Sequence, residues 1–246
     1  MSVSVSVSVS VSVPVSVSVP VPVSVSVSAG RITGMGLDVM VGALIGAEED
    51  VADWFRGECA TISAVLEREG LPGWREPVDG PRFGDRVWGY SGLHTLRRVA
   101  AHLAATGRLP EPLAEGERAS EDPELREAYD DIPDDPAGPF DHLIHHSDCE
   151  GYYVPVDFGP VLIDEELSGG MLGSSVRLLA ELRTVAEALG LPADLDPYAD
   201  EVTAVLDGEV TDPEGWRRYG TESFICLQLM RAAELSVRTG AAIAFC

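Results

Sequence analysis

The chain has 246 residues, of which 41 are acidic and 17 basic, so its formal charge is −24. That length suits one large domain or two small ones, and the charge disfavours binding to nucleic acid or to an anionic membrane, because both are negative. None of the basic residues is a lysine, which excludes Schiff-base chemistry, a P-loop lysine and a lysine general base.

The strong acidity has two interpretations. It indicates either a function, namely binding to a basic protein partner or imitation of a nucleic acid, or only the solubility of an ordinary bacterial cytosolic protein. The absence of lysine and asparagine, with a single glutamine, indicates a bacterial genome of high GC content. The four cysteines form no C-x-x-C pair, which argues against a zinc ribbon and favours reduced thiols in a cytoplasmic protein.

The beginning of the chain has a composition unlike the rest. Valine occupies every odd position from Val3 to Val27, and serine or proline occupies the even positions between them. Such uniform alternation leaves the register of a strand unspecified, and the prolines remove ladder donors. No basic segment precedes a continuous apolar run, so this is not a secretory signal peptide. We expect residues 1–34 to be a low-complexity Ser/Val/Pro tail, either disordered or the product of a mis-assigned start upstream of Met35.

Residues 35–246 predict a single globular α+β domain that is dominated by helices and contains a small sheet. Apolar residues at three- and four-residue spacing predict the helices, and short β-branched runs predict the strands. The expected strands cover residues 36–45, 152–158 with 161–163, and 241–246. The expected helices cover residues 48–69, 91–106, a short stretch from 123, 174–189, 197–206, and a last one from about 212 to 240. The first and last strands are both apolar, and we expect them to be neighbours at the centre of the sheet.

The segment from Phe140 to Phe158 concentrates groups that bind metals or move protons. It contains three of the five histidines, one cysteine and four carboxylates. Two imidazoles and a carboxylate would reach one ion whether the segment is a helix or a strand, and bound zinc would convert a water molecule into a hydrolytic nucleophile. The predicted metal ligands are His142, His146, Asp148 and Glu150, and zinc (Zn) is the expected cofactor. The alternative is that these polar residues form a turn before the strand that follows.

Two further candidate sites lie in or near this segment. Cys149 beside His145 or His146 would be a nucleophile, with Asp157 in the same cluster, although a free cysteine is also typical of a core. Gly173 and Ser174 precede a helix whose first N–H groups would bind an anion, with Arg177 in its first turn. The alternative for this second candidate is a flexible loop with a good helix cap.

These observations support two hypotheses about function. The first is a soluble, acidic, cytoplasmic protein without catalysis, which binds a protein or ligand partner in the manner of an immunity or adaptor protein. The second is a metal-dependent hydrolase built on the cluster at residues 142–157. For both we expect a protein or small-molecule partner, and neither nucleic acid nor a membrane.

Overall fold

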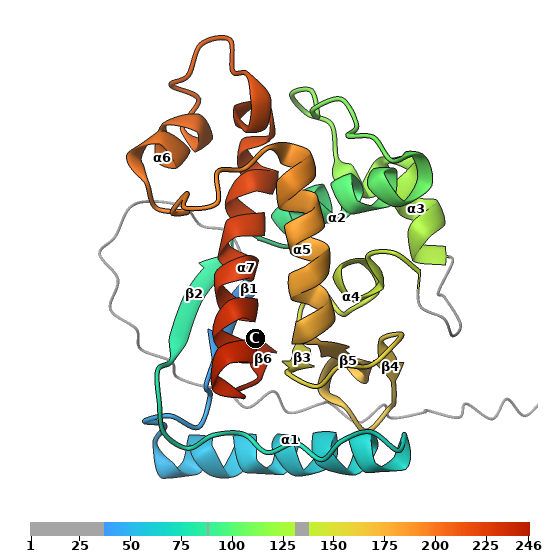
Figure 1. Cartoon of the computed structure of the whole chain (residues 1–246), viewed down its shortest axis with the longest axis vertical. Helices are drawn as coiled ribbons and strands as arrows, with labels where there is room; N and C mark the ends of the chain where they lie inside the picture. Colours follow the sequence, from blue (N-terminus) through green and yellow to red (C-terminus); the bar gives the residue numbers. More distant parts are fainter. Residues whose placement is uncertain (1–36, 88, 131–137) are drawn as a thin grey trace, which may run out of the picture. The chain divides into compact units, whose positions relative to one another are not determined.

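The computed structural model describes residues 37–87, 89–130 and 138–246, which form a helix-dominated α+β domain (Figure 1). This confirms the expected fold class. The predicted tail, residues 1–34, lies outside the described residues, so the expectation for it stays a prediction. None of the described helices is both long enough and apolar enough to cross a membrane.

The described strands form one mixed sheet. Their bounds are β1 Leu37–Val41, β2 Phe83–Val87, β3 Gly151–Val154, β4 Leu162–Ile163, β5 Met171–Ser174 and β6 Ile243–Phe245. The order across the sheet is β2-β1-β6-β3-β5-β4. β1 pairs antiparallel with β6, with Val39 opposite Phe245, so the prediction that the first and last strands are neighbours is confirmed. β3 pairs antiparallel with β6 and parallel with β5.

Two of these strands are not predicted by the sequence. β2 lies in a stretch rich in glycine and proline, residues 70–90, that is typical of a loop, and β5 contains Gly173 in a stretch that also resembles a loop. Glycine and proline lower the local preference for a strand, but that preference is weak and pairing with a neighbour overrides it. β2 pairs along its whole length with β1, and β5 pairs with both β3 and β4.

Seven α-helices are described, with three short 3-10 turns. The α-helices are α1 Glu49–Arg68, α2 Gly89–Thr106, α3 Pro123–Asp130, α4 Asp141–Ile144, α5 Ser175–Leu189, α6 Asp200–Leu206 and α7 Gly220–Thr239. The 3-10 turns are η1 Ala119–Glu121, η2 Ser168–Gly170 and η3 Gly215–Tyr219. The last helix therefore begins at Gly220 and not near residue 212, because η3 occupies the residues just before it.

Several helix ends follow from single residues. The side chain of Ser174 accepts a hydrogen bond from the backbone N–H of Arg177 at 3.2 Å, so the predicted cap of α5 is confirmed. Gly190 and Gly240 end α5 and α7 in the left-handed conformation, with φ of 72° and 83°, which a residue with a side chain adopts less readily.

The sheet lies between two helical layers because its side chains alternate between its two faces. Tyr152, Val154 and Ala244 pack against α1 on one face. Tyr153, Ile243 and the strand β1 pack against α2, α5 and α7 on the other. In Figure 1, α1 lies on one side of the strands and α5 and α7 run side by side on the other.

The segment that carries the predicted metal ligands, residues 140–150, is fixed to α2 by a buried arginine. Arg97 donates to the backbone carbonyls of Leu143 at 2.8 Å and of His146 at 2.6 Å. Arg97 is only 2 % exposed, so these carbonyls receive their hydrogen bonds from a charged donor in the protein interior.

Candidate functional site

His142, the first predicted metal ligand, is buried and both of its ring nitrogens have backbone partners. Nδ1 accepts the N–H of Ser174 at 3.0 Å, and Nε2 lies 2.7 Å from the carbonyl oxygen of Gly159, to which it donates. Burial lowers the pKa of this ring below its ordinary value, which agrees with a neutral imidazole that has one accepting and one donating nitrogen. While these bonds stand, the ring has no lone pair left for a metal ion.

His146 is also buried, at 2 % exposure, and its ring is stacked on Tyr153 with 3.9 Å between the centroids. Its two nitrogens each lie 3.0 Å from a backbone carbonyl oxygen, one of Ser147 and one of Tyr152. Burial lowers the pKa of His146 to about 4, so the ring is neutral at pH 7 and points at carbonyl oxygens of its own chain.

The remaining predicted ligands face other partners. One carboxylate oxygen of Asp148 is 3.3 Å from Nε2 of His94, which lies on α2. The side chain of Glu150 is exposed. Among the described residues, a single set of three ligand atoms from His, Cys, Asp or Glu lies within 4.8 Å of one another. This set belongs to residues outside the predicted cluster. The structure therefore does not bring His142, His146, Asp148 and Glu150 together around one point.

Three of the predicted residues do line a common cavity. A cavity of about 250 Å³ between α2, α3 and the segment 141–148 is lined by His145, His146 and Asp148, together with His94 and Asp141. Its titratable groups are paired with one another: Nδ1 of His145 lies 2.6 Å from the Asp141 carboxylate, and His94 faces Asp148. The cavity thus contains acid–base groups whose polar atoms are already engaged.

The pKa of His145 follows from this pairing. Burial lowers it, but the Asp141 carboxylate and the carbonyl oxygen of Ala128, 2.7 Å from Nε2, raise it to a value above its ordinary one. Both nitrogens of His145 face acceptor oxygens of Asp141 and Ala128, so neither is directed at Cys149 as a base. The thiol of Cys149 is exposed and lies beside the hydroxyl of Ser147, at 3.6 Å.

The predicted anion site at the start of α5 is closed by packing. Gly173 and Ser174 are buried in β5, and the N–H of Ser174 is the one that His142 accepts. Arg177 forms an exposed ion pair with Asp157. An anion would have to displace these existing bonds to reach the N–H groups of α5.

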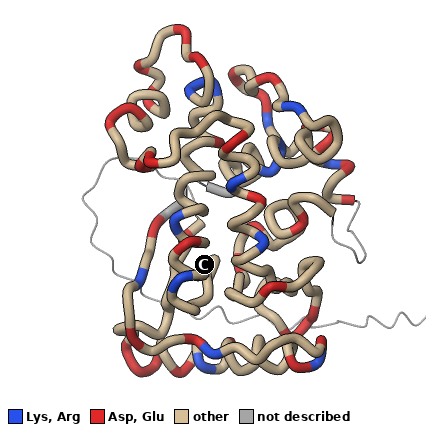
Figure 2. Tube along the Cα trace, viewed as in Figure 1, with Lys and Arg blue, Asp and Glu red and all other residues tan. Residues whose placement is uncertain are grey.

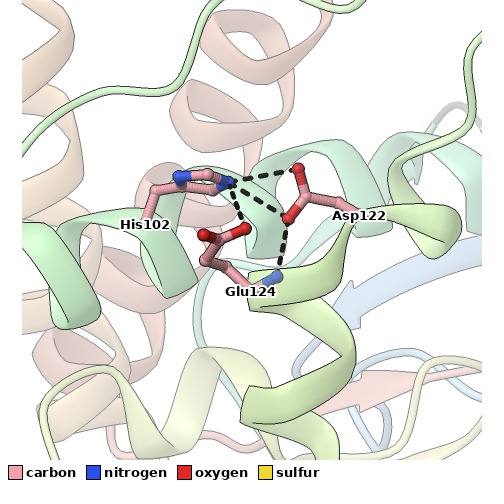
Figure 3. A group of neighbouring side chains, drawn as sticks. All are labelled: His102, Asp122 and Glu124. Carbon is pink, nitrogen blue, oxygen red and sulfur yellow. Dashed lines mark hydrogen bonds and ion pairs between the residues drawn. The ribbon is translucent and has the colours of Figure 1, made fainter.

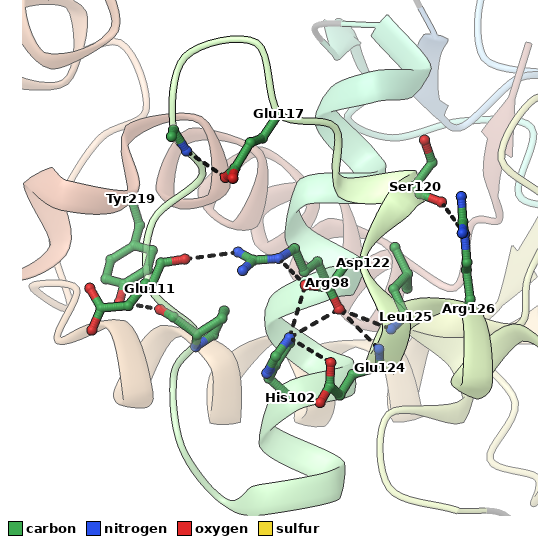
Figure 4. A network of polar contacts seen from close by, with 12 residues as sticks. Arg98, His102, Glu111, Glu117, Ser120, Asp122, Glu124, Leu125, Arg126 and Tyr219 are labelled. Atoms are coloured by element: carbon green, nitrogen blue, oxygen red, sulfur yellow. Dashed lines mark hydrogen bonds and ion pairs between the residues drawn. The ribbon is translucent and has the colours of Figure 1, made fainter.

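One group of metal-ligating residues does converge, on α2 and α3. Nε2 of His102 lies 3.1 Å from both carboxylate oxygens of Asp122 and 3.6 Å from Oε2 of Glu124 (Figure 3). Arg98 also donates to Asp122 at 2.6 Å, and the backbone N–H groups of Glu124 and Leu125 bind the same carboxylate (Figure 4). Although burial raises the pKa of Asp122, its bonds to Arg98 and His102 hold the value below the ordinary one. These donors fill the acceptor positions of the carboxylate, so we interpret the group as a clamp that fixes the start of α3 on α2.

Metal binding at the predicted cluster stays a prediction, and elemental analysis of the protein purified without a histidine tag tests it. We expect far less than one zinc ion per chain, because both nitrogens of His142 are engaged by backbone groups and those of His146 face carbonyl oxygens in the protein interior. Stoichiometric zinc that is lost in His142→Gln and His146→Gln would contradict this expectation and establish the predicted site. Zinc that is lost in His102→Gln alone would place the ion on the clamp of α2 and α3.

Acidic residues are spread along the described chain and outnumber the arginines (Figure 2). The arginines that form ion pairs with carboxylates are Arg56, Arg68, Arg98, Arg177, Arg183, Arg217, Arg218 and Arg231. Residues 191–215 combine eight acids with no arginine, and we call them the acidic lobe. It carries α6 and the loops on both sides of it.

The net negative charge of the chain agrees with the family to which the chain is similar. A family model described as "Putative DNA-mimic protein" matches residues 35–245. The chain belongs to this family. No curated protein and no solved structure gave a match.

Membership of the DNA-mimic family corrects one expectation. The expectation that the partners exclude nucleic acid was wrong, because this family is described as one of DNA mimics. Imitation of a nucleic acid was the other interpretation of the same charge, since a surface that repels DNA attracts what DNA attracts. The expected class, an acidic interaction protein without catalysis, agrees with the family.

The acidic lobe contains none of the predicted site residues. Those residues were chosen around histidines and a cysteine, whereas the lobe has none of either. The signal that points to it is in the sequence: eight carboxylates between residues 194 and 214, with no basic residue among them.

Proposed function

We propose that this protein occupies the DNA-binding surface of a DNA-binding protein and so competes with DNA for it. The observation that carries this proposal is the match of the DNA-mimic family over residues 35–245. The formal charge of −24 supplies the attraction, because a surface built to neutralise phosphates also neutralises carboxylates.

The distribution of arginines supports the same function. Exposed ion pairs of the kind formed by Arg183 with Glu234, or by Arg218 with Glu111, contribute little to stability. Each such pair cancels one positive and one negative charge, so no unpaired arginine is left there to repel a cationic partner. The carboxylates that remain unpaired then define the potential that the partner meets.

The proposal also includes the compartment and the type of protein. A protein that covers the DNA-binding surface of a second protein acts in the compartment that contains DNA. In a bacterial cell this compartment is the cytoplasm. It acts by occupying a site and needs no catalytic group, as in the immunity or adaptor type of protein.

Competition for DNA tests the proposed function directly. DNA-binding proteins from the encoding cell are eluted from a duplex-DNA column and mixed with a short labelled duplex, and their complexes are resolved by a mobility-shift assay. We expect the purified chain to release the labelled duplex from at least one of these proteins, and to do so less well as salt is raised, because the attraction is screened.

A simple polyanion is the control for this experiment. Polyglutamate at the same total charge tests whether charge alone is sufficient. Release that polyglutamate matches at equal charge, or no release of any labelled duplex by the chain, would contradict specific imitation of DNA. Release by the chain at concentrations where polyglutamate has no effect supports it.

A further inference from the structure

The acidic lobe, residues 191–215, differs from most of the described surface because it combines many acids with no arginine of its own. Its eight carboxylates are Asp194, Asp196, Asp200, Glu201, Asp207, Glu209, Asp212 and Glu214, and all are exposed. Two of them have an arginine partner from outside the lobe: Asp196 pairs with Arg231, and Glu201 pairs with Arg217. The other six form no ion pair in the part of the chain that the structure describes.

The position of two of these acids does not serve the stability of the fold. Asp207 is the C-cap of α6 and Glu209 follows it, so both lie at the end of the helix where its dipole disfavours negative charge. Carboxylates that are close together and unpaired also repel one another, which destabilises the folded state. At these two positions the lobe therefore holds charge where folding alone would favour neutral residues.

The lobe is nevertheless a fixed scaffold for this charge. Val202 of α6 is fully buried, and Leu195 and Val205 pack against the main core. Asp196 accepts the backbone N–H of Tyr198 at 2.8 Å, which closes the turn before α6. Carboxylates on a rigid support lose less entropy on binding than carboxylates on a flexible chain.

An exposed aromatic side chain lies among the acids. Tyr198 is 52 % exposed, although its hydroxyl receives a hydrogen bond from Gln228 at 3.2 Å and its ring edge contacts Phe224. The Arg231 guanidinium lies 5.8 Å from the centre of the ring, so this ring already associates with a guanidinium. A half-exposed tyrosine that is held in place, beside unpaired carboxylates, is typical of the centre of a protein interface.

We propose that the acidic lobe is the surface that imitates DNA, and that its partner is an arginine- and lysine-rich DNA-binding face which places one cationic side chain against Tyr198. This inference rests on the proposed function, because it names the face of the molecule that carries it. Charge complementarity commits the lobe to a cationic protein surface.

The outer face of α1 is the main alternative surface, and its charges are arranged differently. Arg56 pairs with both Glu49 and Asp53 on that helix. At the other end of α1, Arg68 pairs with two acids of the segment after β4. Cations are thus interleaved with the acids on α1, whereas the lobe has none of its own.

Two matched sets of substitutions separate these surfaces in the DNA-competition assay. The lobe set is Asp194→Asn, Asp207→Asn, Glu209→Gln and Glu214→Gln. The α1 set is Glu48→Gln, Asp50→Asn, Glu67→Gln and Glu69→Gln. Each set removes four exposed charges and breaks no described ion pair. A second pair, Tyr198→Ala and Trp54→Ala, compares two aromatic side chains of similar exposure, 52 % and 54 %.

We expect the lobe set and Tyr198→Ala each to raise the concentration needed to release the labelled duplex by about tenfold or more. The α1 set and Trp54→Ala are expected to raise it by no more than about twofold, since they change only the long-range field. The melting temperature of the lobe set should equal or exceed that of the unsubstituted protein, because repulsion is relieved. A purely structural role of the lobe would instead lower it.

The outcomes that overturn the inference are distinct from those that overturn the proposed function. If the unsubstituted protein releases the duplex and the α1 set is as damaging as the lobe set, or more so, the lobe is not the imitating surface, although DNA mimicry stands. If the unsubstituted protein releases no duplex, both the function and the assignment of the lobe fail.

Discussion

Replacing Gly173 with alanine is expected to lower the free energy of unfolding by about 3 kcal/mol, as overpacking of a filled core does. Gly173 lies opposite Tyr153 in the parallel pair of β5 and β3, and a Cβ at this position would overlap the tyrosine ring. The ring has no room to move, because it is stacked on His146 and its hydroxyl donates to the carbonyl of His142 at 2.9 Å. Urea unfolding at pH 7 measures the effect.

Gly57 provides the matched control for this substitution. It lies in α1, is exposed, and has no atom within 4 Å of the position that a Cβ would take. Gly57→Ala should therefore raise the free energy of unfolding by about 1 kcal/mol, since alanine is the better residue inside a helix. Equal effects of the two substitutions would show that the packing of Tyr153 over Gly173 is not what requires glycine there.

Lowering the pH from 7 to 5 is expected to reduce the contribution of His146 to the free energy of unfolding by about 2 kcal/mol. Burial lowers the pKa of this ring from 6.5 to about 4. The unfolded chain therefore takes up the proton near pH 6.5, whereas the folded protein resists it until about pH 4. Between these values the unfolded state binds more protons, so stability falls as the pH falls, and below about pH 4 this contribution no longer changes.

Other groups titrate in the same range with the opposite sign, so the effect has to be measured as a difference between variants. Burial raises the pKa of Glu76 to about 7 and that of Glu181 to about 8, and both make the folded protein less stable as the pH rises from about 4.5. We expect the difference in unfolding free energy between the unsubstituted protein and His146→Gln to be about 2 kcal/mol smaller at pH 5 than at pH 7. The same difference at both pH values would show that His146 titrates normally.

His145→Gln is the control of opposite sign. Its pKa is raised in the folded protein, by Asp141 and Ala128 acting against burial, so His145 stabilises the fold below its unfolded pKa and loses that effect as the pH rises through its folded value. The loss of stability caused by His145→Gln should therefore be larger at pH 5 than at pH 8. Two neighbouring histidines would then show opposite pH dependence because one has a carboxylate partner and the other has only carbonyl oxygens.

The fold class and most helix boundaries could be predicted from the sequence because they depend on neighbours in the chain. The apolar spacing of α1, the cap at Ser174 and the glycines that end α5 and α7 act within a few residues, and the structure confirms them. β2 could not be predicted in this way, because its strand conformation depends on pairing with β1, more than forty residues earlier.

The candidate site shows the same division. The sequence correctly showed that histidines and carboxylates lie close together between residues 140 and 158, but closeness along the chain does not decide where side chains point. His142 is held by groups of residues 159 and 174, and His145 reaches back to residue 128. The ring of His146, in contrast, faces carbonyl oxygens of the nearby residues 147 and 152. With their nitrogens directed at these different partners, the three rings do not share a common centre for a metal ion.

By itself, the sequence determined the α+β class, the absence of lysine chemistry and the net charge, because composition and periodicity are properties of the chain in any conformation. Only the tertiary structure decided which charges remain available to a partner. Folding brings Arg217 and Arg231 to two acids of the lobe, leaves the other six exposed on a rigid support, and places Tyr198 among them. Ion pairing and exposure depend on contacts between distant segments, so they follow from the packing and not from the order of residues.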